Sequence, residues 1–207
     1  MTRLFLIRHA RTAAYGRVLT GRDDGVALDP QGREQSIALA RRLRHVRFDA
    51  LYSSPQLRAR QTAEPLSEAT GLALAVRAEF DEIDFGQWSG RDFAELAQDR
   101  AFQRFNLLRS CATVPGGESM AAVQARMVRG LQDLQAAHPD ATVAVFGHGD
   151  PIKAALAWCA GIPLDLFQRL EISLASVSVL ELERDAIRIL GVNHTGDLAD
   201  DDSCQVR

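Results

Sequence analysis

Cysteine is scarce in this chain, and the three that occur, Cys111, Cys159 and Cys204, lie far apart. Their odd number and the absence of Cys-x-x-Cys spacing argue against a disulfide framework and a zinc site. Long apolar runs are also missing, since none approaches the ~18 residues that a membrane-spanning helix needs. Residues 1–3 lead directly into an apolar segment with no signal peptide. We therefore expect a cytoplasmic protein that binds no metal.

A strong excess of charge is absent too. The formal net charge is -3, which gives no reason to expect nucleic acid or an acidic membrane as a partner. The 46% hydrophobic and 25% charged content is typical of a globular protein, and 207 residues suffice for a substantial core. We expect a single domain over residues 1–196, followed by a flexible acidic tail at 197–207.

Several enzyme signatures are missing as well. A cysteine phosphatase needs Cys-x5-Arg, but Cys111 is followed at that spacing by Gly117. Neither the nucleotide-binding G-x-x-x-x-G-K motif nor the G-x-S-x-G motif of serine hydrolases occurs. These absences exclude the corresponding catalytic mechanisms.

Two apolar segments, residues 4–7 and 142–146, each end close to a histidine. Such short runs predict strands that are buried on both faces of a parallel sheet. The first is followed by Arg8 and His9, and the second by Gly147 and His148. Ligands of open α/β sheets bind at the carboxyl ends of strands, so these side chains are candidates for a binding site.

Capping and periodicity signals predict the helices. Asp29 as N-cap and Pro30 at the first helical position indicate a helix start. The expected inward stripe is Ile37, Ala40 and Leu43, and the expected outward arginines are Arg41, Arg42 and Arg44. A second helix carries Arg58 in its first turn and ends at Gly71. Further helices are expected over residues 92–108, 120–134 and 152–160.

The remaining strands are predicted at residues 50–52, 72–76, 176–182 and 186–192. Carboxylates alternate with apolar residues over 80–88, which fits either an edge strand with acidic outer positions or a source of catalytic acid. The alternation of strands and helices predicts an α/β fold: three α/β/α layers with a mostly parallel central sheet.

The carboxyl ends of parallel strands lie on one edge of a sheet, which brings Arg8, His9, Arg58 and His148 into one crevice. Two arginines and two histidines near helix N-termini form an anion site suited to phosphate. One histidine can attack phosphorus while the other cations hold the phosphoryl oxygens. The leaving oxygen also needs an acid, and Asp81, Glu82 and Asp84 are the candidates.

Four motifs in this order resemble the histidine phosphatase superfamily, the phosphoglycerate mutase-like family with its R-H-G signature. They are Leu6-Ile7-Arg8-His9 with Thr12, the segments 54–63 and 81–90, and Phe146-Gly147-His148-Gly149. Residues 28–35 also resemble the family's L-T-x-x-G-x-x-Q segment. The short form with the Glu82 motif is similar to broad-specificity and α-ribazole phosphatase-like members.

The resemblance implies a role for each matching position. His9 matches the nucleophile that becomes a phosphohistidine, and Glu82 matches the proton donor. Arg8, Arg58 and His148 match the groups that hold and stabilise the phosphoryl group. Thr20, Gly21 and Gly149 match positions that contact phosphate or substrate. No cofactor and no metal is implied, the partner is a small phosphorylated substrate, and a homodimer is possible because dimers are common in the family.

The chain departs from the family pattern next to the signature. Ala10 replaces the usual glycine, a change that is compatible with phosphatase activity. Arg11 replaces the following Glu or Gln, and is interpreted as an exposed loop arginine rather than an extra contact to an anionic substrate. Residues 13–15 take the place of an asparagine that often contacts phosphate.

Three functions fit these residues. Metal-independent phosphomonoester hydrolysis through a phosphohistidine is favoured, because a mutase usually carries added lid segments and residues 92–117 are short. Phosphoglycerate mutase-type transfer is the first alternative. A non-catalytic phosphate-binding regulatory module is the second, although such proteins usually lack one of the five groups that are all present here.

Overall fold

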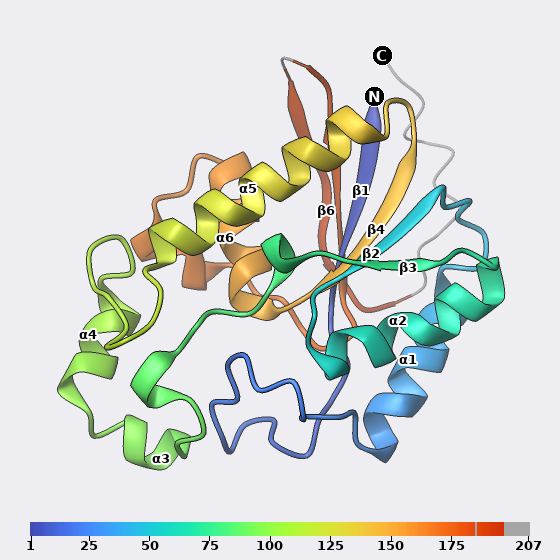
Figure 1. Ribbon diagram of the computed structural model, residues 1–207. Helices are drawn as coiled ribbons and strands as arrows, with labels where there is room; N and C mark the ends of the chain where they lie inside the picture. The colour runs from blue at the N-terminus through green and yellow to red at the C-terminus, as the bar shows by residue number, and fades with distance from the viewer. Residues whose placement is uncertain (185, 197–207) are drawn as a thin grey trace.

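The strands form one mixed sheet. The computed structural model describes residues 1–184 and 186–196, in which six strands take the order β3-β2-β4-β1-β5-β6 (Figure 1). Their bounds are β1 Thr2–Arg8, β2 Ala50–Ser53, β3 Leu74–Val76, β4 Thr142–Gly147, β5 Val177–Leu182 and β6 Ile187–His194. The pairs β1–β4, β4–β2 and β2–β3 are parallel, whereas β5 runs antiparallel to both β1 and β6. The expected mostly parallel sheet is confirmed.

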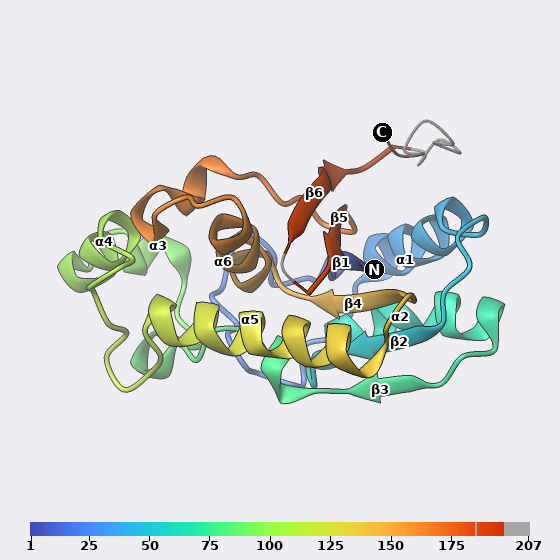
Figure 2. The ribbon, with the colours of Figure 1, turned by 90° about the horizontal axis from the view of Figure 1, so that it is seen from above.

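Helices cover both faces of the sheet. Their bounds are α1 Pro30–Arg42, α2 Leu57–Thr70, α3 Phe93–Leu96, α4 Arg100–Leu107, α5 Met120–Ala137 and α6 Gly149–Cys159. Figure 2 shows α1 and α2 on one side of the sheet and α5 and α6 on the other. The alternation of strand side chains explains this arrangement, since Phe5 and Ile7 pack toward α1 and α2, while Leu4 and Leu6 pack toward α5 and α6.

Local signals set the start of α1 and the end of α2 as expected. The Asp29 carboxylate accepts a 2.7 Å hydrogen bond from the Gly32 amide at the start of α1. Gly71 ends α2 with a φ of 72°, a left-handed conformation that glycine adopts without strain. The Ser119 hydroxyl caps α5, whose buried stripe contains Met127, Leu131 and Leu134.

Two local predictions were wrong, and one of two open interpretations of residues 80–88 was not met. The expected helix over residues 92–108 is two short helices, because the Asp99 carboxylate caps the amides of Ala101 and Phe102 and starts α4 anew. Residues 80–88 form no strand but join two 3₁₀ turns, η1 Ala78–Phe80 and η2 Gly86–Trp88. On α1, Ile37 is exposed while Ser36 and Leu39 face inward.

Arg42 also departs from the expected solvated face. Its guanidinium donates to the carbonyl oxygens of Ala175 and His194, and it is only partly exposed.

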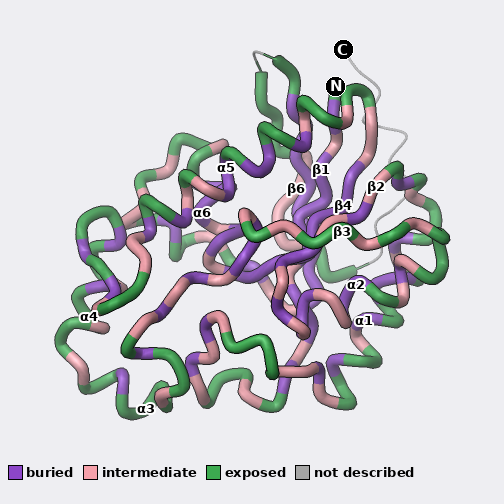
Figure 3. Tube along the Cα trace, in the orientation of Figure 1, coloured by how far each residue is buried: buried purple, intermediate pink, exposed green. Residues whose placement is uncertain are grey.

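Besides the two hydrophobic cores on the faces of the sheet, a third core lies beneath α3 and α4. There Phe85, Trp88 and Phe105 are buried together. Figure 3 shows buried chain running through the central strands, with exposed chain mainly in the outer helices and loops.

Two expectations about the whole chain stay predictions. The single domain over residues 1–196 is one. The acidic tail at 197–207 is the other, and it lies outside the described residues. Within the described ranges, no helix has the length and apolar character needed to cross a membrane.

Candidate active site

The two histidines meet at the carboxyl ends of the central strands. β1 and β4 are parallel neighbours in a register that places Arg8 beside Gly147, so the next residues along each chain, His9 and His148, lie side by side. The His9 amide donates to the Gly147 carbonyl at 2.9 Å. The two imidazole rings are 5.3 Å apart, and each is buried. The predicted convergence of the two strand ends is therefore present.

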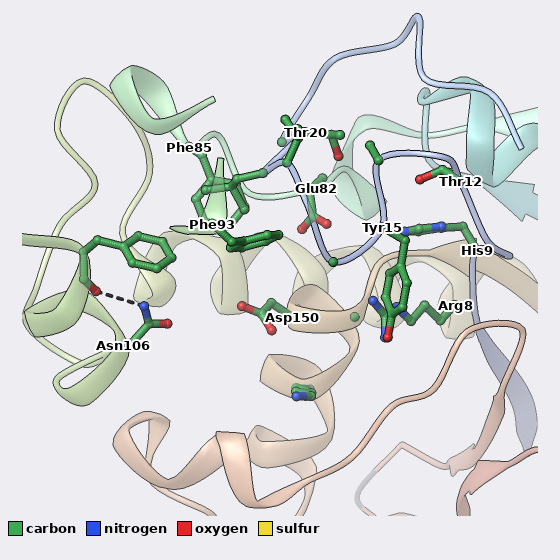
Figure 4. A pocket seen from close by; sticks show the side chains of 18 of the residues that line it. Arg8, His9, Thr12, Tyr15, Thr20, Glu82, Phe85, Phe93, Asn106 and Asp150 are labelled. Carbon is green, nitrogen blue, oxygen red and sulfur yellow. Dashed lines mark hydrogen bonds between the residues drawn. The ribbon is translucent and has the colours of Figure 1, made fainter. Parts of the chain in front are cut away.

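A cleft with a volume of about 380 Å³ opens at this edge of the sheet. Arg8, His9 and Glu82 line its inner part, together with the predicted contact residues Thr20, Gly21 and Gly149. Figure 4 shows Glu82 between the side of the cleft that carries His9 and the side that carries Phe85 and Phe93. Arg58 and His148 are not among the lining residues, because both are almost completely buried behind this surface.

The surroundings of His9 define which ring nitrogen is reactive. Its Nδ1 lies 2.8 Å from the carbonyl oxygen of Ala10, which can only accept a hydrogen bond. Nδ1 therefore carries the proton of the neutral ring, and Nε2 has a free lone pair. Burial lowers the pKa of His9, and the charges of Arg58 and Arg8 lower it further. At neutral pH His9 is an uncharged imidazole with Nε2 available as a nucleophile.

Three buried nitrogen atoms in this region lack a hydrogen-bond partner within the described part of the chain. They are Nε of Arg8, Nε of Arg58 and Nδ1 of His148. Other guanidinium nitrogens are committed to the fold: Nη1 of Arg8 donates to the Ile172 carbonyl at 2.6 Å, and the two Nη atoms of Arg58 donate to the carbonyls of Asp23 and Gly21 at 3.1 and 2.7 Å. Buried polar groups are rarely left unpaired, so this set is organised to bind an anion.

Two glycines make room for this arrangement. A Cβ atom on Gly149 would lie 3.2 Å from Nε of Arg8, so the absence of a side chain lets the guanidinium lie across the first turn of α6. Gly21 has a φ of 50° and turns its carbonyl toward Arg58. Thr20 lines the cleft beside it.

Glu82 is the acidic side chain that reaches the histidines. Its Oε1 accepts a 2.9 Å hydrogen bond from the Ile83 amide, and its Oε2 lies 3.7 Å from Nδ1 of His148. Burial raises the pKa of Glu82 to about 7, against the lowering effect of Arg58. Asp84 is directed instead to the Gly86 amide, and Asp81 lies beside Arg22. Of the three candidate acids, Glu82 alone lines the cleft.

Arg126 on α5 holds the segment that carries Glu82. Its guanidinium donates to the carbonyl oxygens of Glu79, Asp81 and Glu82 at 2.7–3.0 Å. It also makes two 3.1 Å hydrogen bonds to the Glu118 carboxylate. Burial raises the pKa of Glu118, but these bonds and the charge of Arg126 outweigh it and lower that pKa overall. The sequence analysis missed this clamp, because no local pattern links α5 to a loop 44–47 residues away.

The departures next to the signature have distinct surroundings. Ala10 is fully buried, and its amide donates to the Thr62 hydroxyl at 2.9 Å. Arg11 turns away to Gln31 and Asp29 at the start of α1 and does not line the cleft, which agrees with a loop role. Tyr15 lines the cleft, with its ring centroid 5.7 Å from Cζ of Arg8 (Figure 4).

The outer part of the cleft is mainly aromatic. Phe85, Phe93 and Phe102 line it, and Phe93 leaves 36% of its surface exposed. Arg109 is nearly buried beside this wall, where its guanidinium stacks over Phe105 at 4.2 Å and pairs with Asp150 at 3.1 Å. No role was predicted for these residues, since Phe93 and Phe102 lie in a segment that was predicted only as one continuous helix, and Phe85 stands in a motif that was considered only for its carboxylates.

No cluster of three or more His, Cys, Asp or Glu side chains placed to hold a metal ion occurs among residues 1–184 and 186–196. The inner cleft instead holds the guanidinium groups of two arginines beside two neutral histidine rings. These guanidinium groups are themselves suited to neutralise a phosphoryl group.

Comparison with known proteins identifies one relative of similar length and one that is about twice as long. The chain is 33% identical over 201 residues to phosphoserine phosphatase 1 of Hydrogenobacter thermophilus, covering 94% of this chain and 93% of that protein. It is 35% identical over 198 residues to a bifunctional protein of Mycobacterium tuberculosis. That match covers 94% of this chain but only 54% of the relative, so the chain spans about half of its length.

Solved structures agree with this relationship. A phosphoserine phosphatase of Entamoeba histolytica in complex with phosphoserine superposes with a TM-score of 0.85 at 25% identity, covering 96% of this chain and 100% of that one. A mycobacterial glucosyl-3-phosphoglycerate phosphatase gives a TM-score of 0.83 at 28% identity, covering 93% of this chain and 99% of the other. The model of the histidine phosphatase superfamily, branch 1, matches residues 4–195. The chain therefore belongs to branch 1 of the histidine phosphatase superfamily.

Proposed function

We propose that this protein hydrolyses phosphomonoesters of small metabolites through a phosphohistidine intermediate, without a metal or cofactor. The observation that carries the proposal is the set of three unpartnered nitrogens, on Arg8, Arg58 and His148, around the free Nε2 of His9. Together they offer a nucleophile, two arginine N–H donors for the phosphoryl oxygens, and a histidine nitrogen that can take up a proton. The phosphatases among the relatives support the same activity.

In the first step, Nε2 of His9 attacks phosphorus and the ester P–O bond breaks. The proton of the Glu82 carboxyl group passes to the leaving alcohol oxygen, so the alcohol departs neutral. The pKa of about 7 keeps a large share of Glu82 protonated near neutral pH. Arg8 and Arg58 offset the charge that develops on the phosphoryl oxygens.

In the second step, water attacks the phosphohistidine. The Glu82 carboxylate, which has just lost its proton, accepts one from the water as the new P–O bond forms and the P–N bond breaks. Inorganic phosphate leaves, and His9 and Glu82 return to their starting protonation states. One carboxyl group thus serves as acid and then as base.

Hydrolysis is favoured over phosphoryl transfer to a second position of the substrate. The cleft is open to solvent on the side of Tyr15 and Phe93, both of which are substantially exposed. Water can therefore reach the intermediate, whereas a mutase must shield it. Probable phosphoglycerate mutases of Yersinia species are 25% identical to the chain, which is why isomerase activity is measured alongside hydrolysis.

The aromatic outer wall of the cleft favours a substrate whose leaving alcohol carries an apolar ring. A cytoplasmic location is proposed because Cys111 and Cys159 are free, and free thiols suit a reducing compartment. That the protein forms a homodimer stays a prediction, which sedimentation measurements can test.

The test is phosphate release from a panel of phosphomonoesters in chelator-treated buffer, with 3-phosphoglycerate followed separately for its isomer. We expect phosphate from several esters and a 32P-labelled intermediate that is stable in alkali and labile in acid. Isomer formation with little phosphate would establish a mutase instead. Tight phosphate binding with neither reaction would establish the non-catalytic module.

A further inference from the structure

A chain of hydrogen bonds runs from His148 away from the cleft. Nε2 of His148 lies 2.7 Å from Oγ of Ser54, and that oxygen lies 2.6 Å from Oε1 of Gln56. The Nε2 of Gln56 ends the chain 3.4 Å from the carbonyl oxygen of Arg22. Ser54 and Gln56 are buried, at 0% and 3% exposure. This series of hydrogen bonds is therefore enclosed by protein.

Each link in this chain has one chemically allowed direction. The Arg22 carbonyl can only accept, so Gln56 presents its NH₂ group there and its carbonyl oxygen to Ser54. The Ser54 hydroxyl gives its single proton to that oxygen and turns its lone pairs to His148. The proton of the neutral His148 ring therefore lies on Nε2, and Nδ1 carries the lone pair.

Nδ1 of His148 faces the reacting groups. It is buried, has no hydrogen-bond partner among the described residues, and lies 3.7 Å from Glu82 Oε2. A proton taken up there would create an imidazolium whose Nε2–H is already accepted by Ser54. Its new Nδ1–H would point toward the site of the phosphoryl group. A charged donor of this kind binds phosphoryl oxygens more strongly than a neutral one.

We propose that Gln56 is a positioning residue that, through Ser54, keeps the His148 proton on Nε2 and so prepares Nδ1 to be protonated when a phosphoryl group binds. The proposal rests on the proposed phosphatase function. The proton comes from the substrate monoanion or from solvent, and it returns when phosphate leaves.

The charges around His148 explain why phosphate triggers this uptake. Burial lowers the pKa of His148, and nearby cations lower it further, so the ring is neutral in the empty cleft. A phosphate dianion beside Nδ1 opposes those cations. The charged and titratable groups that act on the ring are Glu82 from the loop after η1, Arg58 from α2, Arg8 and His9 from β1, and Arg126 from α5.

The decisive experiment is nitrogen NMR of 15N-histidine-labelled protein without substrate. The His148 signals are identified by their loss in His148→Asn. We expect an Nε2–H tautomer in the wild type. In Gln56→Met, which keeps the side-chain length but removes the acceptor, Ser54 donates to Nε2 and the proton moves to Nδ1. Gln56→Glu retains an acceptor for Ser54 and restores the Nε2–H tautomer.

Inorganic phosphate then tests the second half of the proposal. We expect Nδ1 of wild-type His148 to become protonated on phosphate binding, and this response to weaken in Gln56→Met. The kcat/KM of that variant falls roughly tenfold, since the weakened donor holds the phosphoryl group less strongly. If Gln56→Met does not fold, Ser54→Ala serves, and there the Nε2–H preference is lost.

Two results overturn the proposal: an Nδ1–H tautomer in the wild type, or an unchanged tautomer in folded Gln56→Met. Because the tautomer is measured without turnover, it is independent of the activity. A protein that hydrolyses no ester yet shows the expected tautomers would refute the proposed function alone. An active enzyme whose His148 tautomer is the same in the wild type and in Gln56→Met would refute only the role of Gln56.

Discussion

His9 lies at the end of β1, outside the hydrophobic clusters that hold the sheet together. Its proposed role is chemical, so its removal should cost activity rather than stability. We expect His9→Ala to lower kcat by on the order of 10⁴-fold or more, as loss of a nucleophile does. Its unfolding free energy should stay within about 1 kcal/mol of wild type. Phosphate release and urea unfolding measure the two quantities, and turnover within a few-fold of wild type would exclude His9 as the nucleophile.

Glu82 makes the activity depend on pH. Its pKa is raised to about 7, mainly by burial, so the acid form that protonates the leaving group is lost as the pH rises through that value. We expect kcat/KM for alkyl phosphates to fall above about pH 7. Glu82→Gln should reduce it by roughly 10²–10⁴-fold and remove this pH dependence.

A matched substrate identifies the step that Glu82 serves. p-Nitrophenolate departs without needing a proton, so p-nitrophenyl phosphate should lose far less activity than an alkyl ester in Glu82→Gln. Equal losses with both esters would contradict the role of Glu82 as an acid.

The residues of the inner cleft were predictable because they stand beside recognisable strand ends or in motifs. Residue reasoning placed Arg8, His9 and His148 at one sheet edge, and the motif selected Glu82 among three carboxylates. The position of Gln56 behind His148 was not predictable, because it depends on which way a buried amide turns. That direction is set by the Arg22 carbonyl, a contact between distant parts of the chain.

At the scale of elements, α5 is joined to the catalytic loop by Arg126. This side chain satisfies three carbonyl oxygens and the Glu118 carboxylate, so its loss frees the loop that positions Glu82. We expect Arg126→Gln to lower kcat for alkyl esters more than for p-nitrophenyl phosphate. The unfolding free energy should drop by about 1–3 kcal/mol, because buried acceptors lose their partner.

A control on the same helix separates this effect from a general loss of charge. Arg129 is exposed one turn further along α5, and Arg129→Gln should leave both rate and stability near wild type. If the two variants behave alike, or if Arg126→Gln slows both esters equally, the clamp does not position the acid.

Elements with strong local signals formed as predicted, and those with ambiguous signals did not. The apolar runs of β1 and β4, the cap of α1 and the apolar periodicity of α5 are local features. The break between α3 and α4 depends on the Asp99 carboxylate, an internal cap inside a helix-like pattern. Residues 80–88 alternate like a strand, yet hydrogen bonds with Arg22, Glu118 and Arg126 hold this stretch away from the sheet. The alternation of residue types does not reveal these contacts with distant parts of the chain.

At the scale of the whole molecule, the cleft combines two structures. The sheet edge and the Glu82 loop supply the reacting groups. The outer wall comes from Phe85, which precedes η2, and from α3 and α4, and these segments pack on their own core (Figures 1 and 4). Among the described residues, the cationic side chains of Arg109 and Lys153 line this outer part, and both already have partners. Arg109 is paired with Asp150, and Lys153 donates to Gln168. Aromatic surface therefore dominates recognition of the leaving alcohol.

This division predicts a preference that can be measured with benzyl phosphate and methyl phosphate, both of which release an alkyl alcohol. The wild type should favour the benzyl ester, whose ring packs against Phe93. Phe93→Ala should lower kcat/KM for benzyl phosphate roughly three- to tenfold, in line with the ~0.5–1.5 kcal/mol of an aromatic pair, and spare methyl phosphate. Leu107→Ala, on a side chain that is 73% exposed and outside the cleft, is the control. Equal losses for both esters would mean that Phe93 shapes the fold and not the choice of substrate.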